Sequence, residues 1–79
     1  MRWKYHLTDK SKRIYVYAYS RESDELDGLI SFDVEKQSAS MMRPSKTDVS
    51  SKKAQAKAIE HFWTVVNEGF PVERYVSCG

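Results

Sequence analysis

Cys78 is the only cysteine in the sequence, so an internal disulfide is excluded. No apolar run stands at the N-terminus, and none approaches the ~20 residues of a membrane span. We therefore expect neither a signal peptide nor a transmembrane segment, and a cytoplasmic location is the simplest interpretation. We expect Cys78 itself to be an exposed thiol close to the chain end.

An excess of charge of either sign is also missing. Thirteen basic and eleven acidic residues give a net charge of +2, less than a strongly basic nucleic-acid-binding domain would carry. Apolar residues make up 41% and charged residues 30% of the sequence, which is typical of a globular chain rather than a disordered one. The 79 residues suffice for one small domain with little room for a deep pocket.

The sequence contains no motif that carries catalytic or metal chemistry. His6 and His61 are the only histidines, and neither has a ligand spacing or a nucleophile partner in Cys78. The carboxylates of residues 24–27 do not follow a calcium-loop pattern, and no glycine-rich phosphate loop is present. We predict that the protein is not an enzyme and has no catalytic residue, no cofactor and no metal site.

One long helix is expected over residues 50–68. Apolar side chains recur there at intervals of three and four residues, which is helical spacing: Ala58, Ile59, Phe62, Val65 and Val66. Asp48, Ser50 and Ser51 can each cap the N-terminus, and Gly69 can end the helix in the left-handed conformation. A single helix of this kind cannot bury its apolar stripe alone, so it needs a second layer.

The first 43 residues have the alternation of strands. A four-residue loop at Asp9–Lys12 would join strands over residues 2–8 and 13–19. That loop predicts three cross-strand pairs on the more apolar face: Trp3 with Ala18, Tyr5 with Val16, and Leu7 with Ile14. A third strand over residues 29–35 and a turn at Lys36–Gln37 would lead to a fourth over residues 38–43. This second hairpin pairs Val34 with Ala39 and Phe32 with Met41.

These elements predict an α+β fold. The expected architecture is an antiparallel sheet of three to four strands in the order β-β-β-β-α, with one helix packed on one face. The sequence leaves open whether residues 72–77 form a short C-terminal strand or an extended tail. Within the single domain we assign the sheet to residues 1–43, the connector to 44–49, the helix to 50–68 and the C-terminal tail to 69–79. The face toward the helix would carry ten side chains: Trp3, Tyr5, Leu7, Ile14, Val16, Ala18, Ile30, Phe32, Val34 and Met41.

The opposite face, left open to solvent, is the leading candidate for function. It would carry three cationic or titratable side chains beside a row of phenols: Arg2, Lys4, His6, Tyr15, Tyr17 and Tyr19. Tyrosine and arginine are enriched in the centres of protein interfaces. We predict a non-enzymatic binding module that holds a protein partner or a second copy of itself through this face. In the alternative, the tyrosines form purely structural cross-strand ladders.

Nucleic-acid binding is the alternative function. Aromatic rings beside cations on an open sheet can stack single-stranded bases. A basic cluster near the helix start would add a weak anion site or be a solvated lysine face: Arg43, Lys46, Lys52 and Lys53. Asp33 and Glu35 lie on the same sheet face and would repel phosphates. No membrane partner is expected.

No motif identifies a family. In element order alone, the layout resembles the small DNA-binding domains at the start of phage and transposon integrases and in plant AP2-type factors. That resemblance implies contact with DNA through the open sheet face, here Arg2, Lys4, Tyr15 and Tyr17.

Overall fold

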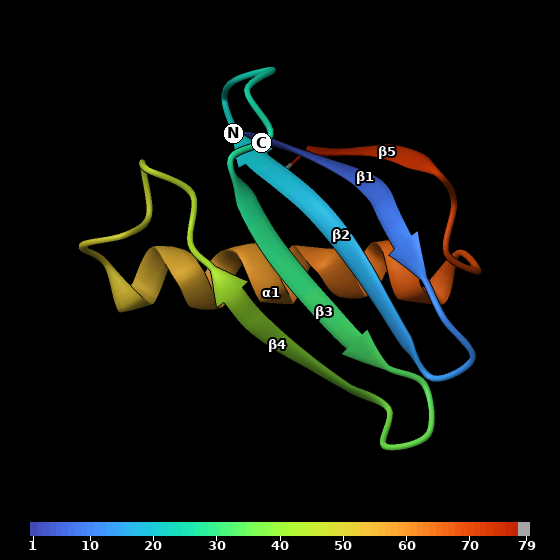
Figure 1. Ribbon diagram of the computed structural model, residues 1–79. Helices are drawn as coiled ribbons and strands as arrows, with labels where there is room; N and C mark the ends of the chain where they lie inside the picture. The colour runs from blue at the N-terminus through green and yellow to red at the C-terminus, as the bar shows by residue number, and fades with distance from the viewer. Residues whose placement is uncertain (78–79) are drawn as a thin grey trace.

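A five-stranded antiparallel sheet and one helix make up the protein, as the computed structural model, which describes residues 1–77, shows in Figure 1. The elements follow in the order β1 (Arg2–Lys10), β2 (Ile14–Arg21), β3 (Gly28–Asp33), β4 (Ser38–Arg43), α1 (Lys52–Asn67) and β5 (Glu73–Ser77). The strand order across the sheet is β4-β3-β2-β1-β5, and α1 runs across one face. The predicted α+β class is confirmed.

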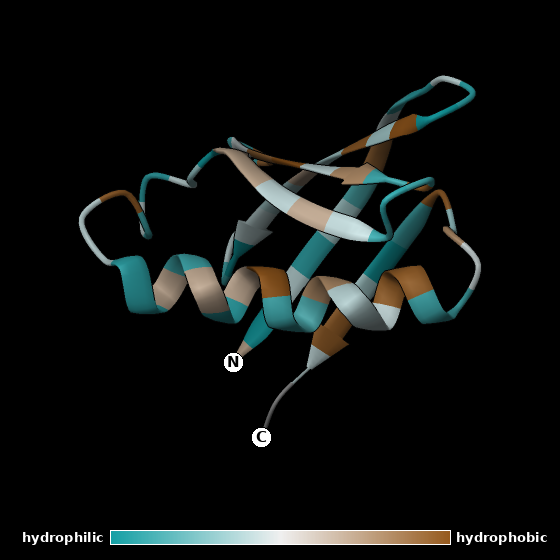
Figure 2. Cartoon of the chain, turned by 90° about the horizontal axis from the view of Figure 1, so that it is seen from below, coloured by the Kyte–Doolittle hydropathy of each residue, from teal (hydrophilic) through white to brown (hydrophobic). Residues whose placement is uncertain are grey.

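The helix has the capping that its sequence indicates. The Ser51 hydroxyl accepts a hydrogen bond from the Ala54 amide at 3.1 Å, so Ser51 is the N-cap among the three candidates. At the other end Gly69 adopts a φ of 84°, and the Phe70 amide donates to the Val65 carbonyl at 3.2 Å. Hydrophilic and hydrophobic residues alternate along α1 in Figure 2, as expected for a helix with one face on a sheet.

The C-terminal segment forms a fifth strand, which the sequence left open. β5 pairs antiparallel with β1, placing Val76 opposite Trp3 and Glu73 opposite His6. β1 is therefore an interior strand, flanked by β2 and β5. Cys78, expected to be an exposed thiol, lies outside the described residues.

The β1–β2 pairing differs from the expected one. β1 continues to Lys10, which pairs with Tyr15, and a bulge between Leu7 and Asp9 then shifts the register by one residue. Beyond the bulge Tyr5 pairs with Tyr19, instead of the predicted Val16. That offset of three residues is odd, and an odd offset moves a strand's side chains to the other face.

The tyrosine row consequently faces the helix, which overturns the prediction of an open phenol face. Tyr17 and Tyr19 are fully buried in the core, and Tyr15 is half-buried against the Phe70 ring. The residues predicted to lie under the helix, Ile14, Val16 and Ala18, take the opposite face. Three phenols bury far more apolar surface than those three aliphatic side chains, which favours this arrangement.

The other strands keep their predicted faces. Ile30 and Phe32 of β3 are fully buried under α1 together with Trp3 and Tyr5 of β1. Phe32 pairs with Ala39 rather than the predicted Met41, a slip of two residues, because the turn takes four residues, 34–37. An even slip leaves the side chains of residues 38–41 on their expected faces, and an irregularity beyond Met41 then pairs Arg43 with Leu29.

Phe62 of α1 sits at the middle of this aromatic core. Its ring centroid lies 5.2 Å from that of Tyr17 and 5.6 Å from that of Tyr5, in edge-on and tilted arrangements. Aromatic pairs in such geometries add roughly 0.5–1.5 kcal/mol each beyond the area they bury.

The hydroxyls of the fully buried Tyr5, Tyr17 and Tyr19 also bind other segments to the sheet. The Tyr5 hydroxyl donates to the Ala58 carbonyl of α1, and the Tyr17 hydroxyl donates to the Pro71 carbonyl after the helix, both at 2.6 Å. The Tyr19 hydroxyl donates to Asp48 Oδ2 at 3.0 Å, in the connector before the helix. Each of these three hydroxyls therefore has a hydrogen-bond partner, as burial requires.

Candidate binding surfaces

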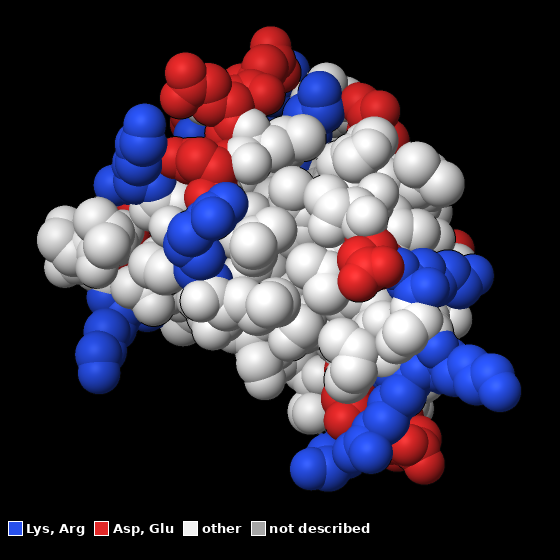
Figure 3. Space-filling view, viewed as in Figure 1, with Lys and Arg blue, Asp and Glu red and all other residues white. Residues whose placement is uncertain are grey.

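The face of the sheet that α1 leaves uncovered is the largest candidate surface. Its centre carries small and apolar side chains from β2 and β3: Ile14, Val16, Ala18, Leu29 and Ser31. Figure 3 shows this helix-free face, with an uncharged area across the middle and charged side chains around it. A surface of this kind, apolar inside and polar at the rim, is the usual layout of a protein interface.

The two ends of the helix-free face carry opposite charges. The loop between β2 and β3 holds four carboxylates: Glu22, Asp24, Glu25 and Asp27. The turns at the other end of the strands hold Lys10, Lys12, Arg13 and Lys36. Arg13 is paired with Asp33 at 3.1 Å and with Glu35 at 3.0 Å. With Asp9 included, these four cations exceed the three carboxylates of the same end by one, so that end is weakly positive. Figure 3 shows the acidic end at the top and the basic end at the lower right.

Tyr75 of β5 forms a cation–aromatic cluster at one side of this face. The Arg2 guanidinium lies 5.0 Å from the Tyr75 ring centroid, and Lys4 Nζ lies 5.3 Å from it. Lys4 Nζ is also 3.4 Å from Glu73 Oε1, an ion pair at the same edge. Tyr75 is not evident as a surface residue from the sequence, since its pairing with Lys4 depends on β5 joining β1.

The six predicted partner-binding residues are divided between the two faces. Arg2, Lys4 and His6 lie on the helix-free face as predicted, because they alternate with the buried Trp3 and Tyr5. The row of Tyr15, Tyr17 and Tyr19 does not, because its side chains pack toward α1.

The predicted anion cluster is also divided. Arg43 Nε donates to the Asp27 carbonyl at 3.0 Å, and the Lys46 amide donates to Asp27 Oδ2 at 3.1 Å. Desolvation raises the pKa of Asp27, but the hydrogen bonds from Lys46 and Ser45 outweigh it and hold that pKa below its usual value. Lys52 and Lys53 are exposed on the first turn of α1, and Lys53 borders a separate cleft.

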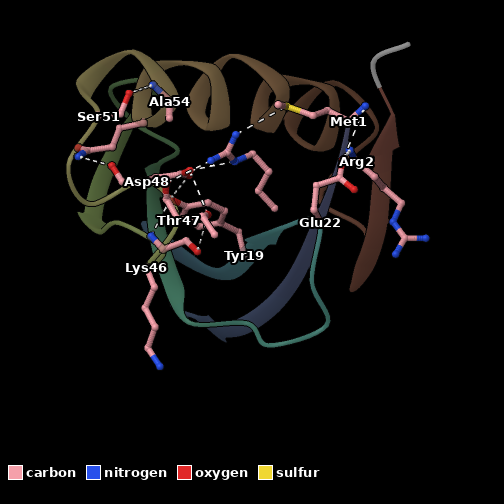
Figure 4. Close-up of polar contacts among 12 residues, drawn as sticks. Met1, Arg2, Tyr19, Glu22, Lys46, Thr47, Asp48, Ser51 and Ala54 are labelled. Carbon is pink, nitrogen blue, oxygen red and sulfur yellow. Dashed lines mark hydrogen bonds and ion pairs between the residues drawn. The ribbon is translucent and has the colours of Figure 1, made fainter.

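The connector between β4 and α1 is held by a buried carboxylate (Figure 4). Asp48 is fully buried, and Arg21 Nε lies 3.0 Å from its Oδ1. The Tyr19 hydroxyl donates to the second oxygen, Oδ2, and accepts from the Ser45 amide at 2.9 Å. This network fixes the start of α1 against the end of β2.

A cleft of about 490 Å³ opens between α1 and the N-terminal end of β1. It is lined by eight residues: Met1, Trp3, Arg21, Ser51, Lys53, Ala54, Lys57 and His61. The rings of Trp3 and His61 stack there with their centroids 4.1 Å apart. This pair is not evident from the sequence, because the two rings come together only when α1 crosses the sheet.

Within residues 1–77 no helix has both the length and the apolar character needed to cross a membrane. The same residues contain no group of three or more His, Cys, Asp or Glu side chains placed to hold a metal ion.

Comparison of the chain with protein-family models, with curated proteins and with solved structures found no match. Its surfaces are therefore interpreted from their own geometry and chemistry.

Proposed function

We propose that the protein is a non-enzymatic binding module that associates with a second copy of itself through the helix-free face. The observation that supports this is the uncharged centre of that face between ends of opposite charge. Val16 and Leu29, which α1 does not cover, would be removed from water on association. We place this function in the cytoplasm, the compartment that the sequence favours.

The charge layout favours one arrangement of the two copies. In this arrangement a two-fold axis lies between the two faces and perpendicular to the strands, so the strands of the two copies run antiparallel. Each acidic β2–β3 loop then lies over the basic turns of the other copy. Such an interface is self-complementary, as a two-fold interface must be, and its opposite charges steer the two copies into register.

Sedimentation equilibrium over a range of protein concentrations tests the proposal. The wild type is expected to pass from monomer to dimer, and Val16→Glu is expected to weaken the dimer at least tenfold, about 1.4 kcal/mol. Ala56→Glu, the matched control, introduces the same charge on the exposed side of α1 and leaves the dimer unchanged. A wild type that stays monomeric at every concentration would rule out self-association and leave a different protein partner for this face.

Nucleic-acid binding is a second candidate, supported by the cluster of Arg2 and Lys4 around the Tyr75 ring. An exposed aromatic ring flanked by cations offers a stacking surface and phosphate contacts in one place. The burial of Tyr17 and Tyr19 removes the longer stacking platform that the sequence suggested. The self-association proposal is therefore preferred.

A further inference from the structure

The cleft beside α1 has the size and lining of a small-molecule site. Its volume of about 490 Å³ falls within the range of typical ligand pockets. The stacked Trp3 and His61 rings and Ala54 provide flat and apolar surface, while the long side chains of Lys53 and Lys57 border it. Among the described residues that line the cleft, none is an aspartate or a glutamate.

Trp3, one of the residues that line the cleft, carries a buried hydrogen-bond donor without an acceptor. Trp3 is only 3% exposed, and its indole Nε1 has no hydrogen-bond partner in the part of the chain that the structure describes. An unsatisfied buried donor is costly, and such groups are rare in native proteins. An oxygen of a bound molecule would remove this cost once a small movement of the lining side chains exposes the indole N–H.

The cations at the cleft differ in how far they are already neutralised. Arg21 is committed to Asp48 through the 3.0 Å contact. Lys57 Nζ lies 3.5 Å from Glu60 Oε2, but both side chains are more than half exposed, and such pairs are weak. Lys53 is exposed and forms no ion pair within residues 1–77. The cleft therefore presents a net positive rim above an apolar floor.

We propose that this cleft binds a small organic anion with an apolar or aromatic body. The body lies against the Trp3–His61 pair and Ala54, and the acidic group lies between Lys53 and Lys57. This site is on the helix side of the sheet, so it is separate from the helix-free face and does not depend on the proposed self-association.

Isothermal titration calorimetry with three probes tests the proposal. 3-Phenylpropionate and octanoate carry the same carboxylate on an aromatic and an aliphatic body, and 3-phenylpropanamide is the uncharged counterpart of the first. At least one of the two acids is expected to bind saturably with a Kd below ~1 mM, at least about tenfold more tightly than the amide. In a Trp63→Phe background Trp3 is the only tryptophan, so its fluorescence should change along the same binding curve.

Variants of the rim connect the binding to this cleft. The double variant Lys53→Ala, Lys57→Ala is expected to weaken binding of the acid about tenfold, because it removes both rim cations. The matched control Lys10→Ala, Lys12→Ala removes two cations from the β1–β2 turn and should bind like the wild type. Three results would each overturn the proposal. The first is that no acid saturates the protein by ~10 mM, and the second is that acid and amide bind with equal affinity. The third is that the two double variants lose equal affinity.

Discussion

Arg21 and Asp48 form an ion pair in which the carboxylate has no solvent exposure at all, with Arg21 Nε 3.0 Å from Asp48 Oδ1. One partner comes from the end of β2 and the other from the connector before α1. Asp48 Oδ2 also accepts from the Tyr19 hydroxyl, and Oδ1 accepts from the Thr47 hydroxyl, so one carboxylate contacts three side chains. A buried charge is tolerated only when it is paired and hydrogen-bonded in this way.

Replacement of Asp48 should be the most destabilising single change in the connector. Asp48→Ala removes the partner of Arg21 and the acceptor of the Tyr19 hydroxyl, and is expected to lower the free energy of unfolding by about 3–5 kcal/mol. Urea denaturation followed by circular dichroism measures this loss.

The double variant Arg21→Met, Asp48→Ala provides the control for coupling. Because the methionine leaves no unpaired charge, the double variant should be more stable than Asp48→Ala alone. If the double variant instead loses as much stability as Arg21→Met and Asp48→Ala lose together, the two side chains act independently.

Stability should fall at alkaline pH because of the buried phenols. Burial raises the pKa of Tyr17 to about 12, and burial also raises the pKa values of Tyr5 and Tyr19. A raised folded-state pKa stabilises the protein fully below the unfolded value of about 10, and that stability is lost as pH rises from about 10 to 12.

Urea denaturation at a series of pH values measures this effect. Tyr17→Phe has no phenol to ionise at this position, so its stability should decline less steeply between about pH 10 and 12 than that of the wild type. Equal slopes for the two proteins would show that Tyr17 does not contribute to the alkaline loss.

Gly28 should not tolerate a side chain, because it lies under the Tyr19 ring. The two residues pair across β2 and β3, and a Cβ at Gly28 would lie 2.2 Å from Tyr19 Cε1. Gly28→Ala is therefore expected to cost about 1–3 kcal/mol, as overpacking in a well-packed core does. Thermal denaturation gives the size of the loss, which should shrink in a Tyr19→Leu background, where the ring is absent.

Charge exchange between the ends of the helix-free face should control self-association. Lys10→Glu, Lys12→Glu makes the basic end acidic, and Asp24→Lys, Glu25→Lys makes the acidic end basic. Each double variant alone places like charges together, so its dimer should weaken at least tenfold, about 1.4 kcal/mol.

An equimolar mixture of the two charge variants should recover the dimer. In the mixed pair both contacts again join opposite charges, and sedimentation of one fluorescently labelled variant with the other detects the complex. Salt should weaken both the wild-type and the mixed dimers, because exposed charges are screened. If the mixture forms no complex even at low salt, the antiparallel arrangement is contradicted.

The nucleic-acid alternative predicts a salt-dependent complex with single strands. Fluorescence anisotropy with a labelled oligonucleotide at ~50 mM salt should detect it, since phosphate contacts are strong at that concentration. Lys4→Ala and Tyr75→Ala should each reduce binding, and Lys57→Ala, on α1 and outside the predicted anion cluster, serves as the control. Absence of binding under these conditions would dismiss this candidate.

Local patterns in the sequence determined the fold class and the helix. The spacing of Ala58, Phe62 and Val65, the cap at Ser51 and the glycine at position 69 are all readable within one segment. The alternation in residues 29–35 likewise predicted that Ile30 and Phe32 share the buried face. Periods of 3.6 and 2 are properties of a single element, so they require no knowledge of its neighbours.

The binding surfaces depended on information that no single segment contains. Alternation in β2 separates Tyr17 and Tyr19 from Val16 and Ala18, but it does not say which set meets the helix. The bulge after Leu7 decided this, because one extra residue aligns Tyr5 with Tyr19 and brings the phenols under α1.

The strand β5 decided the rest, since only its pairing with β1 brings Tyr75 to Arg2 and Lys4. The sequence by itself thus determined the helix, the first four strands and the alternation of side chains within each strand. The tertiary structure alone decided which face the helix covers, because burying the larger aromatic set lowers the free energy most.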